Sequence, residues 1–170
     1  MIIKFKSIYF AGLRGFDNDK DLRNDISNYQ IIHEPVENNT AAIAAKLVYP
    51  KKTVISFNGD GCFMMLGQEI INAVENKLNP IFIIINNKKL GTIRMHQERN
   101  FPKRTIGTDI LNPDFVALAN AYGLDAYSVT KTEEFANIFE KAKMNQNATL
   151  IELVIEPNVL GPTLEIGKNI

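Results

Sequence analysis

The chain has 170 residues, of which 45% are hydrophobic and 22% are charged, and its 19 basic residues equal its 19 acidic residues. This size and composition fit one globular domain with a sizeable core, and the zero net charge argues against nucleic acid as a partner. The longest strongly apolar run, residues 80–85, is too short to span a membrane. The single cysteine, Cys62, fits the reducing conditions of the cytoplasm.

Turn residues and apolar periodicity divide the chain into helices and strands. Before residue 40 the pattern is weak: residues 2–10 and 29–32 resemble strands, whereas residues 17–28 are too rich in Asp and Asn for a good helix. The remaining predicted elements, in chain order, are a helix at 40–47, a strand at 53–57, a helix at 67–76, a strand at 80–85, a helix at 113–122, a strand at 125–129, a helix at 132–144 and a strand at 149–155.

Capping residues predict where two of the later helices begin and end. Asn112 followed by Pro113 predicts a helix with Asn112 as its cap, because proline suits the first helical turn. Gly123 predicts the end of the same helix. Thr132 is the predicted cap of the next helix.

The alternation of strand and helix predicts an α/β fold, in which a parallel sheet is covered by helices on both faces. In such sheets ligands collect at the carboxyl ends of the strands. Two strand ends carry polar residues here, namely Gly59-Asp60-Gly61 and Asn86-Asn87. We therefore expect these residues to lie at one edge of the sheet.

The residue types at these strand ends are typical of a metal-bridged diphosphate. Glycine lets the backbone approach a ligand, and a following helix would point its positive end at a phosphate. The oxygens of Asp60 and of an Asn side chain are hard ligands that suit Mg²⁺. Two tight turns without a ligand explain the same residues, so both interpretations stay open at this point.

Three stretches resemble the diphosphate-binding domain of thiamine diphosphate (ThDP) enzymes, with the acetolactate synthase-like group as the nearest relatives. They are NGDGCFMMLGQEI at 58–70, IIINN at 83–87 and LGTIRMHQERN at 90–100. The family motif begins with Gly-Asp-Gly and ends with Asn-Asn after a helix and a strand. The conjunction of both parts is specific, whereas either alone would be a weak match.

The resemblance implies ThDP and Mg²⁺ as cofactors and assigns roles residue by residue. Asp60 and Asn87 stand at the metal-ligand positions, and Lys89 stands where the family uses a backbone carbonyl as the third protein ligand. The residues implied to contact the cofactor are Gly59, Asp60, Gly61, Cys62, Asn87, Leu90 and Gly91.

The sequence departs from the family pattern before residue 40. The family has a glycine-rich stretch with a bulky apolar residue there, whereas residues 33–39 read HEPVENN. The family also uses a glutamate from a pyrimidine-binding domain, and Glu34 after His33 resembles that residue. A solvated surface His-Glu pair explains the same two residues.

The basic stretch after residue 90 raises a similar choice. His96 lies near the position where acetolactate synthases carry an aromatic residue at the substrate entrance. The nearby basic residues suit an acidic substrate or partner, but an exposed, solvated loop accounts for them equally well. This second group comprises Arg94, Arg99, Lys103 and Arg104.

The resemblance divides the chain into an uncertain N-terminal segment at 1–39, which would be a remnant of a pyrimidine-binding domain, a ThDP- and Mg²⁺-binding domain at 40–158, and a C-terminal tail at 159–170. It implies a 2-oxo acid substrate and a pyrimidine-binding domain supplied by a homodimer or another chain. Two alternatives remain: a truncated, non-catalytic chain that keeps the fold, and an unrelated α/β phosphate binder.

Overall fold

The computed structural model describes residues 29–32, 38–161 and 164–166. The predictions for residues 2–10 and 17–28 fall outside this part of the chain. In chain order, the elements are β1 (Tyr29–Ile32), α2 (Asn38–Val48), β2 (Thr53–Gly59), α3 (Asp60–Leu66), the 3₁₀ helix η2 (Gly67–Ile70), α4 (Ile71–Glu75), β3 (Ile81–Asn86), α5 (Gly91–Asn100), α6 (Phe115–Ala121), β4 (Asp125–Val129), α7 (Thr132–Met144), β5 (Thr149–Val154), β6 (Val159–Gly161) and β7 (Leu164–Glu165).

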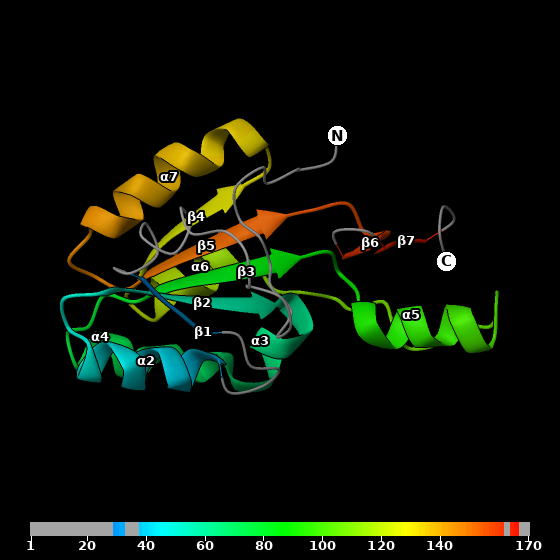
Figure 1. The fold of residues 1–170 in the computed structure, drawn as a ribbon, viewed down its shortest axis with the longest axis horizontal. Helices are drawn as coiled ribbons and strands as arrows, with labels where there is room; N and C mark the ends of the chain where they lie inside the picture. The colour runs from blue at the N-terminus through cyan, green and yellow to red at the C-terminus, as the bar shows by residue number, and fades with distance from the viewer. Residues whose placement is uncertain (1–28, 33–37, 162–163, 167–170) are drawn as a thin grey trace, which may run out of the picture.

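Five strands form one sheet in the order β1-β2-β3-β5-β4, and every neighbouring pair is parallel (Figure 1). The predicted α/β fold with a parallel sheet is therefore confirmed. β2 has five consecutive buried residues and β3 has four, as expected of parallel strands that are covered on both faces. β6 and β7 form a separate antiparallel pair.

One face of the sheet, here called the α2 face, packs against α2, α3, α4 and α6. Phe63 of α3 and Phe115 of α6 are fully buried on it, and their rings meet edge to face at 5.5 Å. Phe82 and Ile84 of β3 and Leu150 of β5 belong to the same apolar cluster. Burying a side chain of this size stabilises the fold by about 1.5–3 kcal/mol.

The opposite face, here called the α7 face, packs against α7. Phe135 of α7 stacks on Phe139 at 5.4 Å and covers an apolar surface made by the strands. Side chains alternate between the two faces along a strand. The strand residues on the α7 face are therefore those adjacent in sequence to the strand residues on the α2 face. The buried strand residues of the α7 face are Ile55, Phe57, Ile81, Ile83, Val129, Ile151 and Leu153.

The predicted starts of two helices were wrong. α6 is capped by Asp114, whose Oδ1 accepts from the Ala117 amide at 2.9 Å, and not by Asn112 with Pro113 in the first turn. Asn112 uses its side chain elsewhere, as described below. α7 has Lys131 at its N-cap position, and the Glu134 carboxylate accepts from the Lys131 amide at 3.3 Å, so Thr132 is the first helical residue and not the cap.

Three other helical predictions hold fully or in part. The chain around Gly123 ends α6 as predicted, and its φ of +88° is a conformation that glycine adopts readily. The segment predicted as one helix at 67–76 forms η2 followed directly by α4, and Leu66, with φ −136° and ψ 29°, separates η2 from α3. Helix α2 starts two residues earlier than predicted, at Asn38.

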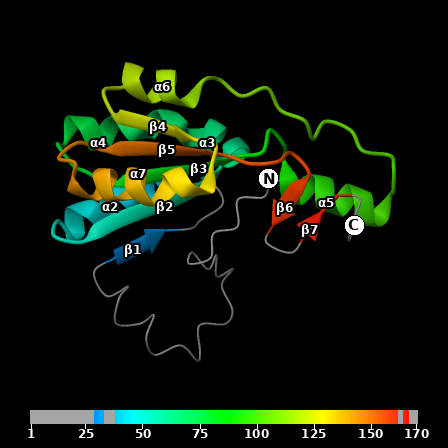
Figure 2. The ribbon, with the colours of Figure 1, turned by 90° about the horizontal axis from the view of Figure 1, so that it is seen from above.

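Helix α5 occupies a segment for which no helix was predicted. None of its ten residues is buried, and it lies beside β6 beyond the carboxyl ends of the strands (Figures 1 and 2). An ion pair between Arg94 and Glu98 joins two successive turns. Across the described residues, each helix is too short or too polar to cross a bilayer.

Candidate functional site

The two predicted motifs meet at the carboxyl edge of the sheet. β2 ends at Gly59, which pairs with Ile85 one residue before the end of β3. β3 ends at Asn86, which pairs with Val154 at the end of β5. Residues that follow β2 and β3 therefore lie side by side, as the strand order requires.

The α2 face changes from apolar to polar toward this edge. On β3 the sequence Phe82, Ile84, Asn86 occupies the α2 face, and on β5 Leu150 is followed there by Glu152. β2 and β4 show the same change. We call the polar end of the α2 face the group Asn58, Asn86, Ser128 and Glu152.

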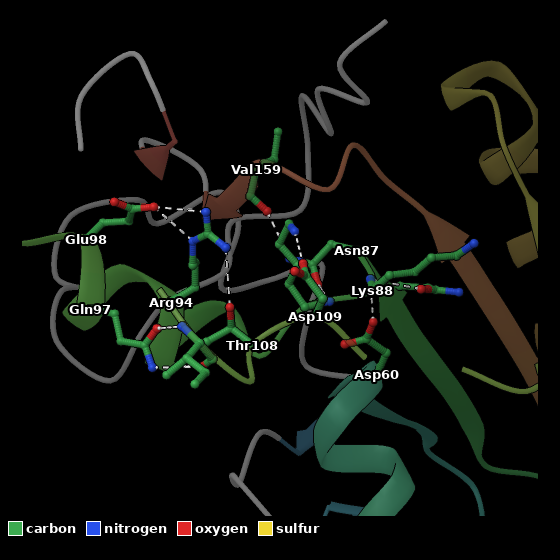
Figure 3. A network of polar contacts seen from close by, with 12 residues as sticks. Asp60, Asn87, Lys88, Arg94, Gln97, Glu98, Thr108, Asp109 and Val159 are labelled. Atoms are coloured by element: carbon green, nitrogen blue, oxygen red, sulfur yellow. Dashed lines mark hydrogen bonds and ion pairs between the residues drawn. The ribbon is translucent and has the colours of Figure 1, made fainter. Parts of the chain in front are cut away.

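Asp60 is the first residue of α3 and is only 2% exposed. Its Oδ1 accepts from the Gly61 amide at 2.8 Å, and its Oδ2 accepts from the Lys88 amide at 2.7 Å (Figure 3) and from Asn112 Nδ2 at 2.8 Å. A carboxylate has about four acceptor positions, so three N–H groups leave room for a cation. The carboxylate is thus fixed in place by the loop after β3.

Asn87 is 9% exposed, and its amide orientation is set by two contacts. Nδ2 donates to the Val159 carbonyl at 3.1 Å (Figure 3), which directs Oδ1 toward the loop, where it accepts from the Lys89 amide at 3.1 Å. The N–H and C=O groups of one residue in an extended segment point the same way. The Lys89 carbonyl therefore faces the side of Asn87 Oδ1.

The loop carrying these groups is held by a short antiparallel contact with residues 108–110. The Leu90 amide donates to the Thr108 carbonyl at 2.8 Å and the Ile110 amide to the Lys88 carbonyl at 3.0 Å. Lys89 also pairs with the exposed Asp109, which lowers the pKa of that carboxyl. Lys88 adopts a left-handed φ of +56°, a strained conformation for a residue with a side chain.

Gly61, Cys62 and Leu90 are also brought together. A Cβ on Gly61 would lie 2.5 Å from Cδ2 of Leu90, so this position requires glycine unless Leu90 moves. Burial, and then the negative charge of Asp60, raise the pKa of the half-buried Cys62 thiol. A protonated thiol is a weak nucleophile, which supports a packing role for Cys62. Gly59 and Gly91 end β2 and begin α5.

The donor set at this edge consists of oxygen atoms. In the described part of the chain, no group of three or more His, Cys, Asp or Glu residues is placed to hold a metal ion. Asp60, the Asn87 amide oxygen and the Lys89 carbonyl would instead supply one charged and two neutral oxygens, a set typical of Mg²⁺ and not of zinc. These residues therefore fit a magnesium ion.

Two polar residues of this region, Asn112 and Glu152, were not predicted as part of the site, and Asn86 was predicted only as part of a polar strand end. Asn112 donates through Nδ2 to Asp60 and, at 2.9 Å, to Asn86 Oδ1. Asn86 in turn donates to Glu152 Oε1 at 2.6 Å. The available signal was Glu152 itself, a charged residue within the otherwise apolar strand 149–155.

The remaining candidates lie elsewhere. His96 is exposed on α5 and not in a loop, and Arg94 on the same helix is paired with Glu98. Glu34 falls outside the described residues. A hollow of about 480 Å³ lies along α2 and η2, where it is lined by Thr40, Ala41, Ala44, Leu66 and Glu69, and includes none of the candidate metal ligands.

The sequence matches the family described as "Thiamine pyrophosphate enzyme, C-terminal TPP binding domain" over residues 38–153. This range contains β2, β3, β4 and almost all of β5, together with every candidate metal ligand. Thiamine pyrophosphate is another name for ThDP.

Individual proteins agree with the family match. The chain is 35% identical to the acetolactate synthase large subunit of Corynebacterium glutamicum, over 76% of this chain and 22% of that protein. It is 34% identical to the pyruvate oxidase of Lactiplantibacillus plantarum, over 67% of this chain and 19% of that protein. Each alignment thus spans about a fifth of the relative.

A solved structure with the same fold is the thiamine diphosphate-dependent 4-hydroxybenzoylformate decarboxylase of Rhodococcus jostii. The TM-score is 0.65 and the sequence identity is 32%, and the match covers 68% of this chain and 22% of the decarboxylase chain.

Proposed function

We propose, from the premise that this chain belongs to the thiamine pyrophosphate enzymes as their C-terminal TPP binding domain, that it holds Mg²⁺ and the diphosphate of ThDP at the carboxyl edge of its sheet. Asp60, the Asn87 side-chain oxygen and the Lys89 carbonyl are the proposed metal ligands. The proposed diphosphate contacts are Gly59, Gly61, Cys62, Leu90 and Gly91.

The observation that carries this proposal is the buried Asp60 carboxylate. It is held by the amides of Gly61 and Lys88 and by Asn112, within a loop whose other oxygens suit Mg²⁺. A carboxylate costs free energy to bury, so a site that positions one with three donors is consistent with a binding role.

The proposed activity is that of an acetolactate synthase-like or 2-oxo acid decarboxylase-like enzyme. When bound, ThDP supplies the electron sink for the carbanion chemistry of a 2-oxo acid. The residues of this chain bind and orient the diphosphate end of the cofactor. A pyrimidine-binding domain, from a second copy or another chain, would complete the site, and His96 on α5 would lie on the substrate side.

The N-terminal part of the proposal concerns residues 1–39. We infer that this segment is a remnant of a pyrimidine-binding domain, that Glu34 serves as the glutamate that contacts the cofactor, and that residues 40–158 form the ThDP- and Mg²⁺-binding domain, with a tail at 159–170.

A second candidate is a chain that keeps the fold but does not catalyse a reaction. It is favoured by residues 33–39, HEPVENN, which have no glycine where the family has a glycine-rich stretch. Such a chain would bind Mg²⁺ and ThDP weakly or not at all.

The test is calorimetric titration of the 170-residue chain with ThDP in Mg²⁺, in the wild type and in Asp60→Asn. This substitution keeps the shape but removes the charge, so we expect affinity to fall at least about tenfold, as for other losses at a metal site. Asp109→Asn is the matched control, since it removes an equal but exposed charge near the same loop, and should keep affinity within about twofold.

Binding that requires Mg²⁺ and is lost in Asp60→Asn alone would support the proposal. Equal losses in both variants would mean that general charge, and not a site at Asp60, attracts the cofactor. No binding by the folded wild-type chain would favour the non-catalytic candidate.

A further inference from the structure

Glu152 is a buried charged residue within the sheet, and it is not one of the proposed ligands. It lies on β5, between Ile84 of β3 and Ser128 of β4, and is 9% exposed. Its Oε1 accepts from Asn86 Nδ2 at 2.6 Å and its Oε2 accepts from Ser128 Oγ at 2.8 Å. A buried carboxylate is retained only where such donors face it.

A series of hydrogen bonds links Glu152 to Asp60 through Asn86 and Asn112, and each bond in it has a defined donor and acceptor. An ionised carboxylate only accepts hydrogen bonds, so Asn86 must turn Nδ2 toward Glu152. Asn86 Oδ1 then faces the loop and accepts from the Lys88 amide at 3.2 Å and from Asn112 Nδ2 at 2.9 Å. Asn112 Nδ2 also donates to Asp60 Oδ2 at 2.8 Å.

Reversal of the Asn86 amide would disrupt all of these contacts together. Its oxygen would face the oxygen of Glu152, and its nitrogen would face the N–H groups of Lys88 and Asn112. Asn112 is already held at a cost, because its Oδ1 is buried and has no hydrogen-bond partner among the described residues. This orientation of the Asn112 amide places Nδ2 where it donates to both Asp60 and Asn86.

We propose that Glu152 and Asn112 are positioning residues for the metal site. Glu152 orients Asn86, Asn86 orients Asn112 and the Lys88 peptide, and these two groups together hold the Asp60 carboxylate. Glu152 acts from the neighbouring strand without contacting the ligand. The inference rests on the proposed function for the identity of the ligand, but not for the hydrogen bonds themselves.

The first test uses Glu152→Leu, which removes the acceptor but keeps a side chain of similar size. The Lys88 amide donates to both Asp60 and Asn86, so its hydrogen exchange, measured by NMR in the unliganded chain, reports the loop directly. We expect exchange to accelerate at least about tenfold, which corresponds to the loss of roughly one hydrogen bond.

Two further variants separate positioning from general stability. Glu152→Gln keeps an oxygen for Asn86 and can donate to Ser128, and should restore Lys88 exchange to within about threefold of the wild type. Thr149→Val is the matched control: it removes a buried hydroxyl of the same strand that bonds at the opposite end, to Asn145. We expect Thr149→Val to leave the exchange rate of the Lys88 amide the same as in the wild type.

The second readout is the affinity for Mn²⁺ in the presence of ThDP, followed by electron paramagnetic resonance. Glu152→Leu should weaken it at least about tenfold and Glu152→Gln should restore it. If Glu152→Leu does not fold, Asn112→Ala serves instead, since it removes the donor shared by Asp60 and Asn86 from a half-buried position.

Unchanged Lys88 exchange in a folded Glu152→Leu chain would overturn the inference, as would an equal acceleration in Thr149→Val. If the wild type binds no Mn²⁺ with ThDP, the proposed function fails, while the exchange comparison still decides whether Glu152 orients the loop.

Discussion

The two faces of the sheet use the same strands for different purposes. On the α7 face, Ile81 and Ile83 of β3 are apolar and buried, and β5 contributes Ile151 and Leu153. On the α2 face, β3 ends in Asn86, and β5 carries Glu152, and both of these polar residues are buried. Residues adjacent in sequence therefore serve packing on one face and a polar site on the other.

This difference between the faces shows that polar side chains are buried where they form hydrogen bonds with one another. Asn86, Asn112, Asp60 and Glu152 bond to one another and to the Lys88 amide, so most of the cost of burying each is offset by its neighbours. The apolar strand residues of the α7 face are buried together in one cluster, and their burial stabilises the fold.

The largest expected effect on stability comes from the α7 face. Ile83→Ala removes a fully buried side chain, and should lower the free energy of unfolding by about 2–5 kcal/mol, measured by denaturant titration. The affinity of the folded protein for ThDP with Mg²⁺ should stay within about twofold, because this face does not contact the site. A larger loss of affinity would show that packing on the α7 face also affects ligand binding on the α2 face.

A moderate effect is expected where α6 begins. Asp114 caps α6 through the Ala117 amide, and Asp114→Ala should lower the free energy of unfolding by about 1 kcal/mol. Thermal unfolding followed by circular dichroism measures this change. Affinity should not change, in contrast to Asn112→Ala two residues earlier, and a comparable loss of affinity in both variants would show that the whole segment, and not Asn112, matters.

The smallest effect is expected at Lys89. Only its backbone carbonyl is proposed as a ligand, and its side chain forms an ion pair with an exposed aspartate, so Lys89→Ala should change the free energy of unfolding by less than about 1 kcal/mol. Calorimetric affinity for ThDP with Mg²⁺ should remain within about twofold. Strong loss of binding would mean that the ammonium group contacts the ligand.

The sequence predicted those features that depend on neighbouring residues. The strands around Val54 and Ile83 were predicted because β-branched runs bounded by turns are local signals. Asp60 was predicted as a candidate because it follows a strand, and Asn87 was assigned through the resemblance to the family motif. The structure then places them at one edge of the sheet, which the strand order requires.

The residues that were missed depend on distant partners. Asn112 lies 52 residues from Asp60 and was predicted as a helix cap, its commonest local role. Glu152 lies 66 residues from Asn86, and a strand pattern cannot indicate which side chain will face it. Helix α5 was missed because it has no apolar stripe from which a helical period could be read.

Helix α5 also has a consequence for how the molecule opens. Because none of its residues is buried, it adds little to the cooperative unit formed by the sheet and its covering helices, and an isolated helix of this length is marginal in water. Its amides should therefore exchange with solvent through a local fluctuation, well before those of β3, whose protection requires global unfolding. Helix α5, which lies next to the proposed ligands, would then unfold independently of the sheet. The exchange rates of its amides would therefore fall when a ligand or partner binds against it.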